Sequence, residues 1–435
     1  MIRCLAELAA EDGSILAPAE SLQVFSILGV RNQFRKYRGK RLALAGSPAC
    51  LFRWLIVLDG IAESIYLLPM ELSRLGVSQI LAEQQLDCLV ADQNSAEEGN
   101  LFYQDAAHCD TKSGAASAFE STLATKLFLP TSGTTGVPKF IAHTLEELSR
   151  PIRRNSGRGK LRWGLLYDPA RFAGMQVLLQ SVINGESVLA PVPAWELTKK
   201  VGWLVSHACD ALSATPSLWR QILTCPESQR LPLVQITLGG EICDQPILNA
   251  LKSRYPLARM TQIYASTEAG VVFSVHDEKP GFPATWLREG TRNRKLRISE
   301  DDTLEITCAS ATGEETWIDT GDVVERVGER VFFRGRKSGL INVGGNKVYP
   351  EELETTLNSL EGVASVLVSA RNSSLMGSLL EVQIVPTASA PEDLVELVRR
   401  YCRQFLPRYK QPAFIKIVNE LPTNATGKRN RLENR

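Results

Sequence analysis

The chain has 435 residues, 44% of them hydrophobic, and its 49 basic residues nearly balance 48 acidic ones. This length predicts about three domains or subdomains, and the balanced charge argues against a nucleic acid as the main partner. Nine cysteines without a Cys-x-x-Cys pair indicate reduced thiols in a cytoplasmic protein. We expect neither a signal peptide nor a membrane span.

The first two thirds of the chain predict alternating helices and strands. Residues 51–70 form an apolar helical stretch, 88–91 a short buried strand, and 92–122 a polar connection. Further strands are expected at 127–130, 161–167, 233–238 and 259–264, and helices at 175–183 and 216–223. Such alternation is typical of an α/β architecture with functional sites at strand ends.

In the last third of the chain the predicted secondary structure changes twice, first to short strands and then back to alternating helices and strands. Short β pieces are expected at 296–298, 304–306 and 331–333, and the pattern restarts after the segment GRKSG at 335–339. The expected elements there are a helix at 350–360, strands at 363–369 and 380–385, an amphipathic helix at 391–405 and a strand at 414–418. We therefore predict a large domain at 1–336 and a small domain at 337–435.

The segment 131–139, TSGTTGVPK, follows a predicted strand and combines hydroxyls, two glycines and a lysine. Glycines let backbone N–H groups approach an anion, hydroxyls add donors, and lysine adds charge, which is what a triphosphate requires. The segment is not a Walker P-loop, because its glycine-to-lysine spacing differs and no Ser or Thr follows the lysine. The alternative is an ordinary flexible surface loop.

This segment resembles the signature loop of the adenylate-forming superfamily, which includes acyl-CoA synthetases, firefly-luciferase-like enzymes and nonribosomal-peptide adenylation domains. Further motifs follow in the family's order over residues 45–435. The resemblance implies a large N-terminal domain of several subdomains, with αβ layers and a small β-barrel-like part, and a small mobile α+β C-terminal domain. By the same resemblance, the loop residues that hold the ATP phosphates are Thr131, Ser132, Gly133, Thr134, Thr135, Gly136 and Lys139.

Two motifs at strand ends resemble the family's adenine-binding walls. Gly240 and Glu241 would lie on one face of the adenine ring and Tyr264 on the other. Thr267 would bind the α-phosphate, and Glu268 would hold Mg²⁺, which prefers hard oxygen ligands. Taken alone, a glutamate in such a turn is a solvated surface residue.

Three further positions complete the implied nucleotide chemistry. In the segment WIDTGD, Asp322 resembles the carboxylate that accepts both ribose hydroxyls, and Arg336 resembles the family arginine that contacts the nucleotide. Lys428, in the segment LPTNATGK, resembles the catalytic lysine, although a lysine in a glycine-containing tail is by itself usually solvated. The carboxylate of the acid and the α-phosphate repel each other, and a nearby cation relieves that repulsion.

The predicted hinge and the segment that follows it concern the thiol step. By alignment with the family Ser338 is the hinge residue, beside Lys337 and Gly339. Gly344 and Gly345 resemble the segment that borders the pantetheine tunnel of CoA ligases, where a side chain would block the thiol arm. A structural β-turn is the alternative for these two glycines.

The segment around Arg171 and Phe172 matches the region where the family shapes its acyl pocket. Phe172 stands where amino-acid-activating domains carry an aspartate, so nothing there pairs an ammonium group and α-amino acids are disfavoured. Arg171 pairs with a second carboxylate or a CoA phosphate, or is solvated. The other residues assigned to the pocket are Gly174, Thr215, Gly239, Ala265 (usually Gly in the family), Ser266 and Val271.

The resemblance thus implies an enzyme that uses ATP and Mg²⁺ to activate a carboxylic acid and transfers the acyl group to a thiol. The first interpretation is an acyl-CoA ligase, with an aromatic acid preferred and a medium-chain or specialised-pathway acid next. The alternative is a stand-alone adenylating enzyme that loads the phosphopantetheine of an acyl or aryl carrier protein. An interpretation of another class is a nucleotide-binding protein without ligase activity. A monomer or homodimer is expected.

Overall fold

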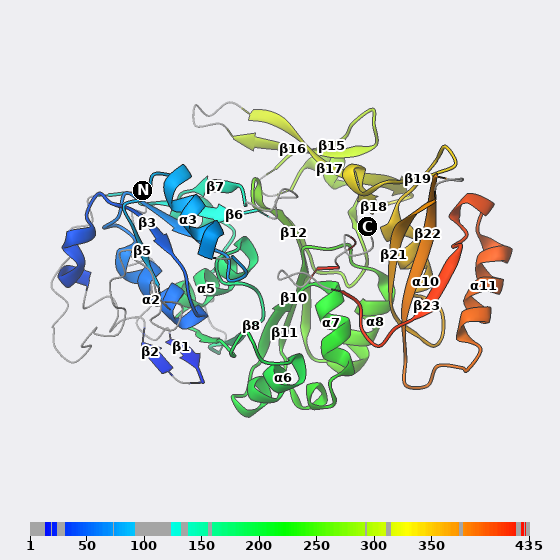
Figure 1. The fold of residues 1–435 in the computed structure, drawn as a ribbon, viewed down its shortest axis with the longest axis horizontal. Helices are drawn as coiled ribbons and strands as arrows, with labels where there is room; N and C mark the ends of the chain where they lie inside the picture. Colours follow the sequence, from blue (N-terminus) through cyan, green and yellow to red (C-terminus); the bar gives the residue numbers. More distant parts are fainter. Residues whose placement is uncertain are drawn as a thin grey trace. The chain divides into compact units, whose positions relative to one another are not determined.

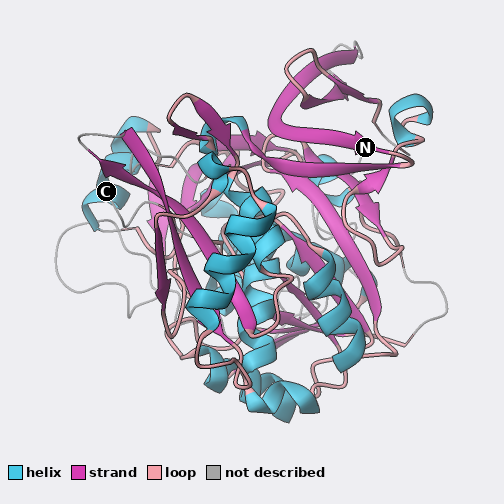
Figure 2. Cartoon of the chain, turned by 90° about the vertical axis from the view of Figure 1, so that its right-hand side faces the viewer, coloured by secondary structure: helices cyan, strands magenta, loops and turns pink. Residues whose placement is uncertain are grey.

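The computed structural model describes residues 14–18, 20–23, 31–72, 74–91, 123–131, 138–154, 159–291, 294–309, 315–373, 377–422, 428–429 and 431. The chain separates into two compact units. Unit 1 comprises 1–213, 225–236 and 266–271, and unit 2 comprises 214–224, 237–265 and 272–435. Both units contain helices and strands. Figure 1 labels elements along the chain, and Figure 2 colours helices cyan and strands magenta.

The first sheet of unit 1 has the strand order β5-β3-β4-β6-β7. Its first four strands pair in parallel and β7 pairs antiparallel to β6. Every residue of β4 is buried, as expected for a strand covered on both faces. The elements of this region are β3 (Arg41–Leu44), α2 (Pro48–Leu58), β4 (Ser64–Leu67), α3 (Arg74–Glu83), β5 (Cys88–Val90), β6 (Lys126–Pro130) and β7 (Phe140–His143).

A second group of strands in unit 1 follows the order β10-β8-β9-β1-β2. It is parallel except for the pairing of β1 with β2. The short helix before it, α4 (Leu145–Ser149), begins with a capping box between Thr144 and Glu147. The remaining elements are β1 (Ser14–Ala17), β2 (Glu20–Gln23), β8 (Arg162–Leu165), α5 (Phe172–Asn184), β9 (Ser187–Leu189), α6 (Leu197–Ser206) and β10 (Ala211–Ala214).

Unit 2 begins with three neighbouring strands in the order β13-β12-β11 and with helices α7 and α8. A five-stranded sheet with the order β14-β18-β17-β16-β15 follows, and all its pairings are antiparallel. The elements are α7 (Pro216–Thr224), β11 (Gln235–Gly239), α8 (Gln245–Arg254), β12 (Arg259–Ser266), β13 (Gly270–Val275), β14 (Phe282–Pro283), α9 (Trp286–Glu289), β15 (Leu296–Ile298), β16 (Thr303–Ala309), β17 (Glu315–Val327) and β18 (Arg330–Arg336).

The last part of unit 2 is an α+β arrangement with its own core. Strand β22 pairs antiparallel to β21 and parallel to β23, and helices α10 and α11 contribute Leu353, Leu357 and Val398 to the core. The hairpin β19–β20 precedes them. The elements are β19 (Ile341–Val343), β20 (Asn346–Val348), α10 (Pro350–Leu357), β21 (Val363–Ser373), β22 (Gly377–Pro386), α11 (Leu394–Phe405) and β23 (Phe414–Ile417).

The predicted α/β fold class is confirmed, and so is the restart of the pattern after residue 339. One predicted element is wrong: residues 51–70 are not one helix, because α2 ends at Leu58 and the buried strand Ser64–Leu67 follows. A continuous apolar run is compatible with a buried helix and with a buried strand, and periodicity does not separate them. The predicted polar connection at 92–122 lies outside the described residues. The predicted domain boundary between 336 and 337 stays a prediction.

The described residues bear on two expectations from the sequence, which concern membrane spans and disulfide bonds. None of the helices in that part of the chain has both the length and the apolar character needed to cross a bilayer. The seven cysteines that the structure describes are outside any disulfide bond: Cys50, Cys88, Cys209, Cys225, Cys243, Cys308 and Cys402.

Candidate active site

The hydroxyl- and glycine-rich loop connects the end of β6 to β7. The backbone N–H of Thr131 donates to the carbonyl oxygen of Lys139 at 2.8 Å, and the Thr131 hydroxyl donates to the same oxygen at 3.3 Å. These contacts hold the two ends of the loop together at the carboxyl end of a parallel strand. Between them, the predicted phosphate-binding residues Ser132, Gly133, Thr134, Thr135 and Gly136 lie outside the described residues.

In unit 1, a histidine that the sequence did not single out lies among three predicted site residues. His143, the last residue of β7, is buried, and its ring centroid lies 6.2 Å from that of Phe172. Burial lowers the pKa of His143; the charges of Glu147 and Glu268 and a hydrogen bond with the Thr267 backbone oppose that shift. Its imidazole is therefore neutral near pH 7, and it joins Phe172 to Thr267 and Glu268.

The predicted acyl-pocket segment begins helix α5, with Arg171 at the N-cap position. The Arg171 guanidinium forms an ion pair with Glu71, and its Nε lies 3.6 Å from Oδ2 of buried Asp168. A Cβ atom on Gly174 would lie 2.3 Å from the backbone oxygen of Asp168, so close packing requires glycine there. Arg171 thus has carboxylate partners within the chain, and Phe172 is buried.

Asp168 is the buried acid of this segment. Its carboxylate accepts hydrogen bonds from the backbone N–H groups of Ala170 at 2.9 Å and Met70 at 3.3 Å. Burial nevertheless raises the pKa of Asp168 to about 6, and the charge of Glu71 acts in the same direction. Part of the Asp168 population is therefore protonated at mildly acidic pH.

In unit 2, the predicted adenine- and ribose-contacting residues meet directly. The Tyr264 hydroxyl donates to Oδ2 of Asp322 at 2.5 Å, and Nε of Arg336 donates to Oδ1 at 2.8 Å. Asp322 on β17 stands opposite Arg336 on β18, which explains their contact. Burial, followed by the charge of Asp322, raises the pKa of Tyr264. Its ring stacks with Phe273 and Phe333, at centroid distances of 5.0 and 4.9 Å.

Lys428 lies beside the glycine pair that ends β11. A Cβ atom built on Gly240 would lie 3.0 Å from Cε and 3.7 Å from Nζ of Lys428, and 3.7 Å from Cγ2 of Thr215. Gly240 has a φ of +83°, a conformation that side chains disfavour. Beside it, a Cβ on Gly239 would lie 3.2 Å from the carbonyl oxygen of Ile263. The lysine, Thr215 and both glycines therefore form one local group.

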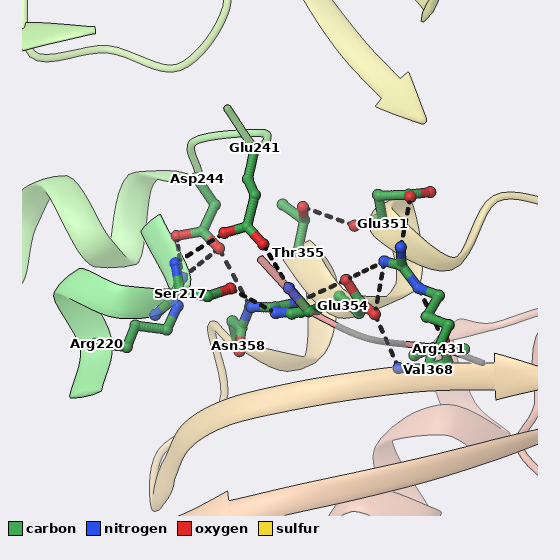
Figure 3. A network of polar contacts seen from close by, with 11 residues as sticks. Ser217, Arg220, Glu241, Asp244, Glu351, Glu354, Thr355, Asn358, Val368 and Arg431 are labelled. Carbon is green, nitrogen blue, oxygen red and sulfur yellow. Dashed lines mark hydrogen bonds and ion pairs between the residues drawn. The ribbon is translucent and has the colours of Figure 1, made fainter. Parts of the chain in front are cut away.

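The carboxylate of Glu241 is held by two backbone N–H groups. Its Oε2 accepts the backbone N–H of Ser217 at 2.9 Å (Figure 3), and its Oε1 accepts the backbone N–H of Arg429 at 2.9 Å. Its carboxylate thus satisfies an N–H group in the first turn of α7, where a negative charge is favourable. The predicted role of Glu241 beside adenine stays a prediction, and Ser217 and Arg429 are its observed partners.

The predicted hinge and thiol-tunnel residues fall on short turns. Ser338 lies in the 3₁₀ turn Lys337–Gly339, and Gly344 and Gly345 are the two-residue turn between β19 and β20. Both glycines have positive φ, at +57° and +85°, as two-residue hairpin turns require. This geometry gives them a structural reason of their own, and their place beside a thiol tunnel stays a prediction.

Gly335, three residues before Ser338, makes an unusually close approach to a carboxylate. Its φ is +151°, and a Cβ atom there would lie 2.5 Å from Oε2 of Glu351 and 3.1 Å from Cβ of Tyr349. Only glycine fits between β18 and the start of α10 with this geometry.

The remaining predicted residues lie at the end of β12, in the turn that follows it and at the start of β13. Ser266 accepts the backbone N–H of Ala269 at 3.0 Å through its hydroxyl, and Ala265 and Val271 are partly buried. Glu268 is exposed. A single exposed carboxylate suits Mg²⁺, which proteins commonly bind through one or two carboxylates together with substrate phosphates. Among the described residues, no group of three or more His, Cys, Asp or Glu side chains is arranged to hold a metal ion by itself.

The sequence also missed an ionic network around the tail. Arg429 and Arg431 both pair with Glu354 of α10, at 2.5 and 2.9 Å, and Arg431 also pairs with Glu351 at 3.0 Å. Burial acts to lower the pKa of Arg431, but the carboxylates of Glu354 and Glu351 raise it overall. The sequence did contain a signal for this network: two arginines at 429 and 431, and two glutamates three residues apart, at 351 and 354, on a predicted helix. Their burial was not visible in the sequence.

Comparison with known proteins identifies the family. The family model described as AMP-binding enzyme matches residues 64–315, more than half of the chain. The model described as AMP-binding enzyme C-terminal domain matches residues 352–428, a range that ends at Lys428.

Three curated relatives illustrate the range of similar proteins. The chain is 32% identical over 171 residues to the 3,4-dihydroxybenzoate–aryl-carrier protein ligase of Bacillus anthracis, covering 39% of each protein. It is 27% identical over 331 residues to the nonribosomal peptide synthetase sidE of Aspergillus fumigatus, covering 68% of this chain and 16% of that protein. It is 26% identical over 352 residues to the 2-succinylbenzoate–CoA ligase of Bacillus pumilus, covering 72% of this chain and 69% of that ligase. The chain thus spans less than half the length of the first two relatives.

The same fold is found in solved structures. The o-succinylbenzoate CoA synthetase of Bacillus subtilis, solved with its acyl-adenylate intermediate, has a TM-score of 0.71 and 20% identity, and the match covers 99% of this chain and 96% of that one. The two family models show that the chain belongs to the AMP-binding enzymes, and the solved structure shows that it shares their fold.

Proposed function

We propose that this protein activates a carboxylic acid with ATP and Mg²⁺ as an acyl-adenylate and then transfers the acyl group to a thiol. The observation that carries the proposal is the position of Lys428 beside Gly240, in the same unit as the Tyr264–Asp322–Arg336 group. Each oxygen of Asp322 accepts one hydrogen bond from these partners and keeps a lone pair for a ribose hydroxyl. Unit 2 therefore contains the three residues that we assign to the nucleotide and the lysine that we assign to the adenylation step.

The role we assign to Lys428 is electrostatic. The incoming carboxylate and the α-phosphate are both anions, and Mg²⁺, held by Glu268 and the phosphates, would neutralise part of their charge. A cation about 4 Å away contributes on the order of 4 kcal/mol at an effective dielectric constant of about 20. That corresponds to roughly three decades in rate, so the ammonium group of Lys428 is the chain's largest contribution to the first step.

Replacing this lysine tests the assignment. We expect Lys428→Ala to lower acyl-adenylate formation by ~10²- to 10⁴-fold and to leave thiol attack on supplied acyl-adenylate largely intact. Pyrophosphate release measures the first step, and thioester formation from the synthetic acyl-adenylate measures the second. Arg403→Ala removes an equally positive, exposed side chain elsewhere and serves as the control. An equal loss of both steps would refute the role of Lys428.

The acid we propose is aromatic, and the acceptor is coenzyme A. Buried Phe172 supplies an apolar surface, and no carboxylate stands at its position to pair an amino group. Relatives that act on benzoate derivatives support an aryl acid, and their names divide between CoA ligases and an aryl-carrier protein ligase. The second candidate acceptor is therefore the phosphopantetheine of a carrier protein. We expect a monomer or homodimer in the cytoplasm.

One screen separates these possibilities. Pyrophosphate release is measured with ATP and Mg²⁺ against benzoate, 2-succinylbenzoate, 3,4-dihydroxybenzoate, octanoate and phenylalanine, with and without CoA or a phosphopantetheinylated aryl carrier protein. We expect release with an aryl acid and a thioester with CoA. A thioester with the carrier protein alone would establish the second candidate, and ATP binding without release for any acid would support a nucleotide-binding protein that lacks ligase activity.

A further inference from the structure

The residue that follows Lys428 contacts three parts of unit 2 at once. Nε of Arg429 donates to the Ser217 hydroxyl at 3.0 Å, and Nη1 lies 2.5 Å from Oε2 of Glu354. Its backbone N–H donates to Glu241 at 2.9 Å. The side chain is only 11% exposed. Arg429 therefore connects the start of α7 and the turn after β11 to helix α10.

The partners of Arg429 on the nucleotide side are themselves held in place. The carboxylate of Glu241 bridges the backbone N–H groups of Ser217 and Arg429. Thr215 accepts the backbone N–H of Leu218 at 3.1 Å and so stabilises the start of α7. The backbone next to Lys428 is thus bonded to the same turn that brings Gly240 against the lysine side chain.

The neighbouring arginine has a different set of partners. Arg431 pairs with Glu351 and Glu354 and donates to the carbonyl oxygen of Val368 at 3.2 Å. All three partners lie on α10 or β21, in the last part of the chain. Arg431 secures the tail to its own α+β arrangement, whereas Arg429 also holds the tail to residues 217 and 241.

We propose that Arg429 is a positioning residue that holds Lys428 at Gly240 for acyl-adenylate formation. This inference rests on the proposed function, in which Lys428 acts in the first step and not in the second. Arg429 does not touch the reacting atoms in this assignment; it fixes where the lysine backbone lies. Its removal should therefore slow the adenylation step and spare the thiol step.

The principal variant is Arg429→Ala, assayed with the acid from the screen that gives the fastest pyrophosphate release. We expect kcat of pyrophosphate release to fall by roughly 10- to 100-fold, the range for losing charge-assisted hydrogen bonds. KM for ATP and for the acid should stay within about threefold, because the variant leaves their contacts in place. Thioester formation from supplied acyl-adenylate should also stay within about threefold.

Two conservative variants separate positioning from folding. Arg429→Lys keeps the charge beside Glu354 but not both side-chain contacts, so it should recover part of the lost rate. Ser217→Ala removes one hydroxyl, leaves the Glu354 pair intact, and should reduce adenylation about three- to tenfold. Arg403→Ala, on the exposed side of α11, is the charge-matched control. Melting temperatures identify any variant that fails to fold, and Ser217→Ala then carries the test.

The outcomes distinguish this inference from the proposed function. If the wild-type protein releases no pyrophosphate with any acid, the proposed function fails. If it does release pyrophosphate and folded Arg429→Ala and Ser217→Ala keep the wild-type rate, the inference is overturned while the function stands. An equal loss of adenylation and thiol transfer would also overturn the inference, because an arginine that only positions Lys428 should affect the adenylation step alone.

Discussion

Glu354 and Glu381 are two equally buried glutamates whose cationic partners differ in exposure. Both side chains are 4% exposed. The partners of Glu354, Arg429 and Arg431, are 11% and 29% exposed, whereas the partners of Glu381, Lys416 and Arg371, are 53% and 49% exposed. Removing the carboxylate charge therefore leaves two partly buried cations without this partner at Glu354, whereas at Glu381 it leaves two half-exposed cations that water can solvate.

We expect Glu354→Gln to lower the free energy of unfolding by about 3 kcal/mol, the lower end of the cost of breaking a buried ion pair. The lower end applies because glutamine still offers an acceptor for the Val368 N–H and Arg431 keeps Glu351 at 3.0 Å. Glu381→Gln should cost about 1 kcal/mol or less, since a half-exposed cation is rehydrated at little cost.

The assay is urea unfolding followed by circular dichroism, with thermal melting as a second probe, for the wild type and both variants. Equal m-values permit comparison of the midpoints as stability differences. Equal destabilisation by the two substitutions, or a larger effect at Glu381, would refute the argument that partner burial determines the cost. A Glu354→Gln variant as stable as the wild type would show that the tail arginines are not held by that carboxylate.

The remaining predictions concern one glycine and one acid. Gly240→Ala should lower adenylation kcat about tenfold, because the added methyl group would lie 3.0 Å from Cε of Lys428. Gly328→Ala is the control: it has similar backbone strain at a φ of +58° but no atom within 4 Å, so its kcat should stay within about twofold of the wild type. Equal rates for the two variants would contradict the contact between Gly240 and Lys428. The pKa of Asp168 is raised by burial from 3.8 to about 6, so its contribution to stability is present below pH 4 and is lost as pH rises through 6. Asp168→Asn should therefore gain about 3 kcal/mol relative to wild type between pH 4 and 7, measured as melting temperature against pH, and a pH-independent difference would argue against this shift.

The sequence predicted the elements whose patterns are local. Helix α7 and strands β5, β6 and β12 lie within one or two residues of their predicted positions, because caps, glycine turns and apolar periodicity specify them. The strand Ser64–Leu67 was missed because a wholly apolar run carries no periodicity. The turn at Gly344 and Gly345 shows the converse, since a pattern that resembles a functional segment is also what a two-residue hairpin turn requires.

The site was predictable one residue at a time but not as a set of contacts. Tyr264 and Asp322 are 58 positions apart, and Arg429 and Glu354 are 75 apart. In the sequence alone each is an ordinary polar residue, because the partner that the fold brings within hydrogen-bonding distance is far away along the chain. The resemblance to a family supplied Tyr264, Asp322 and Lys428, whereas Arg429 and Glu354 became visible only through burial and charge pairing.

The close approach of Gly335 to Glu351 makes two distant positions interdependent. Any side chain at 335 displaces the carboxylate of Glu351, which in turn pairs with Arg431 at 3.0 Å. A substitution at the end of β18 would therefore disturb the ion pair of Arg431, nearly a hundred residues later in the chain. A shorter residue at 351 would relieve the contact with the carboxylate, but the positive φ of Gly335 and the Cβ of Tyr349 at 3.1 Å would still disfavour a side chain at 335.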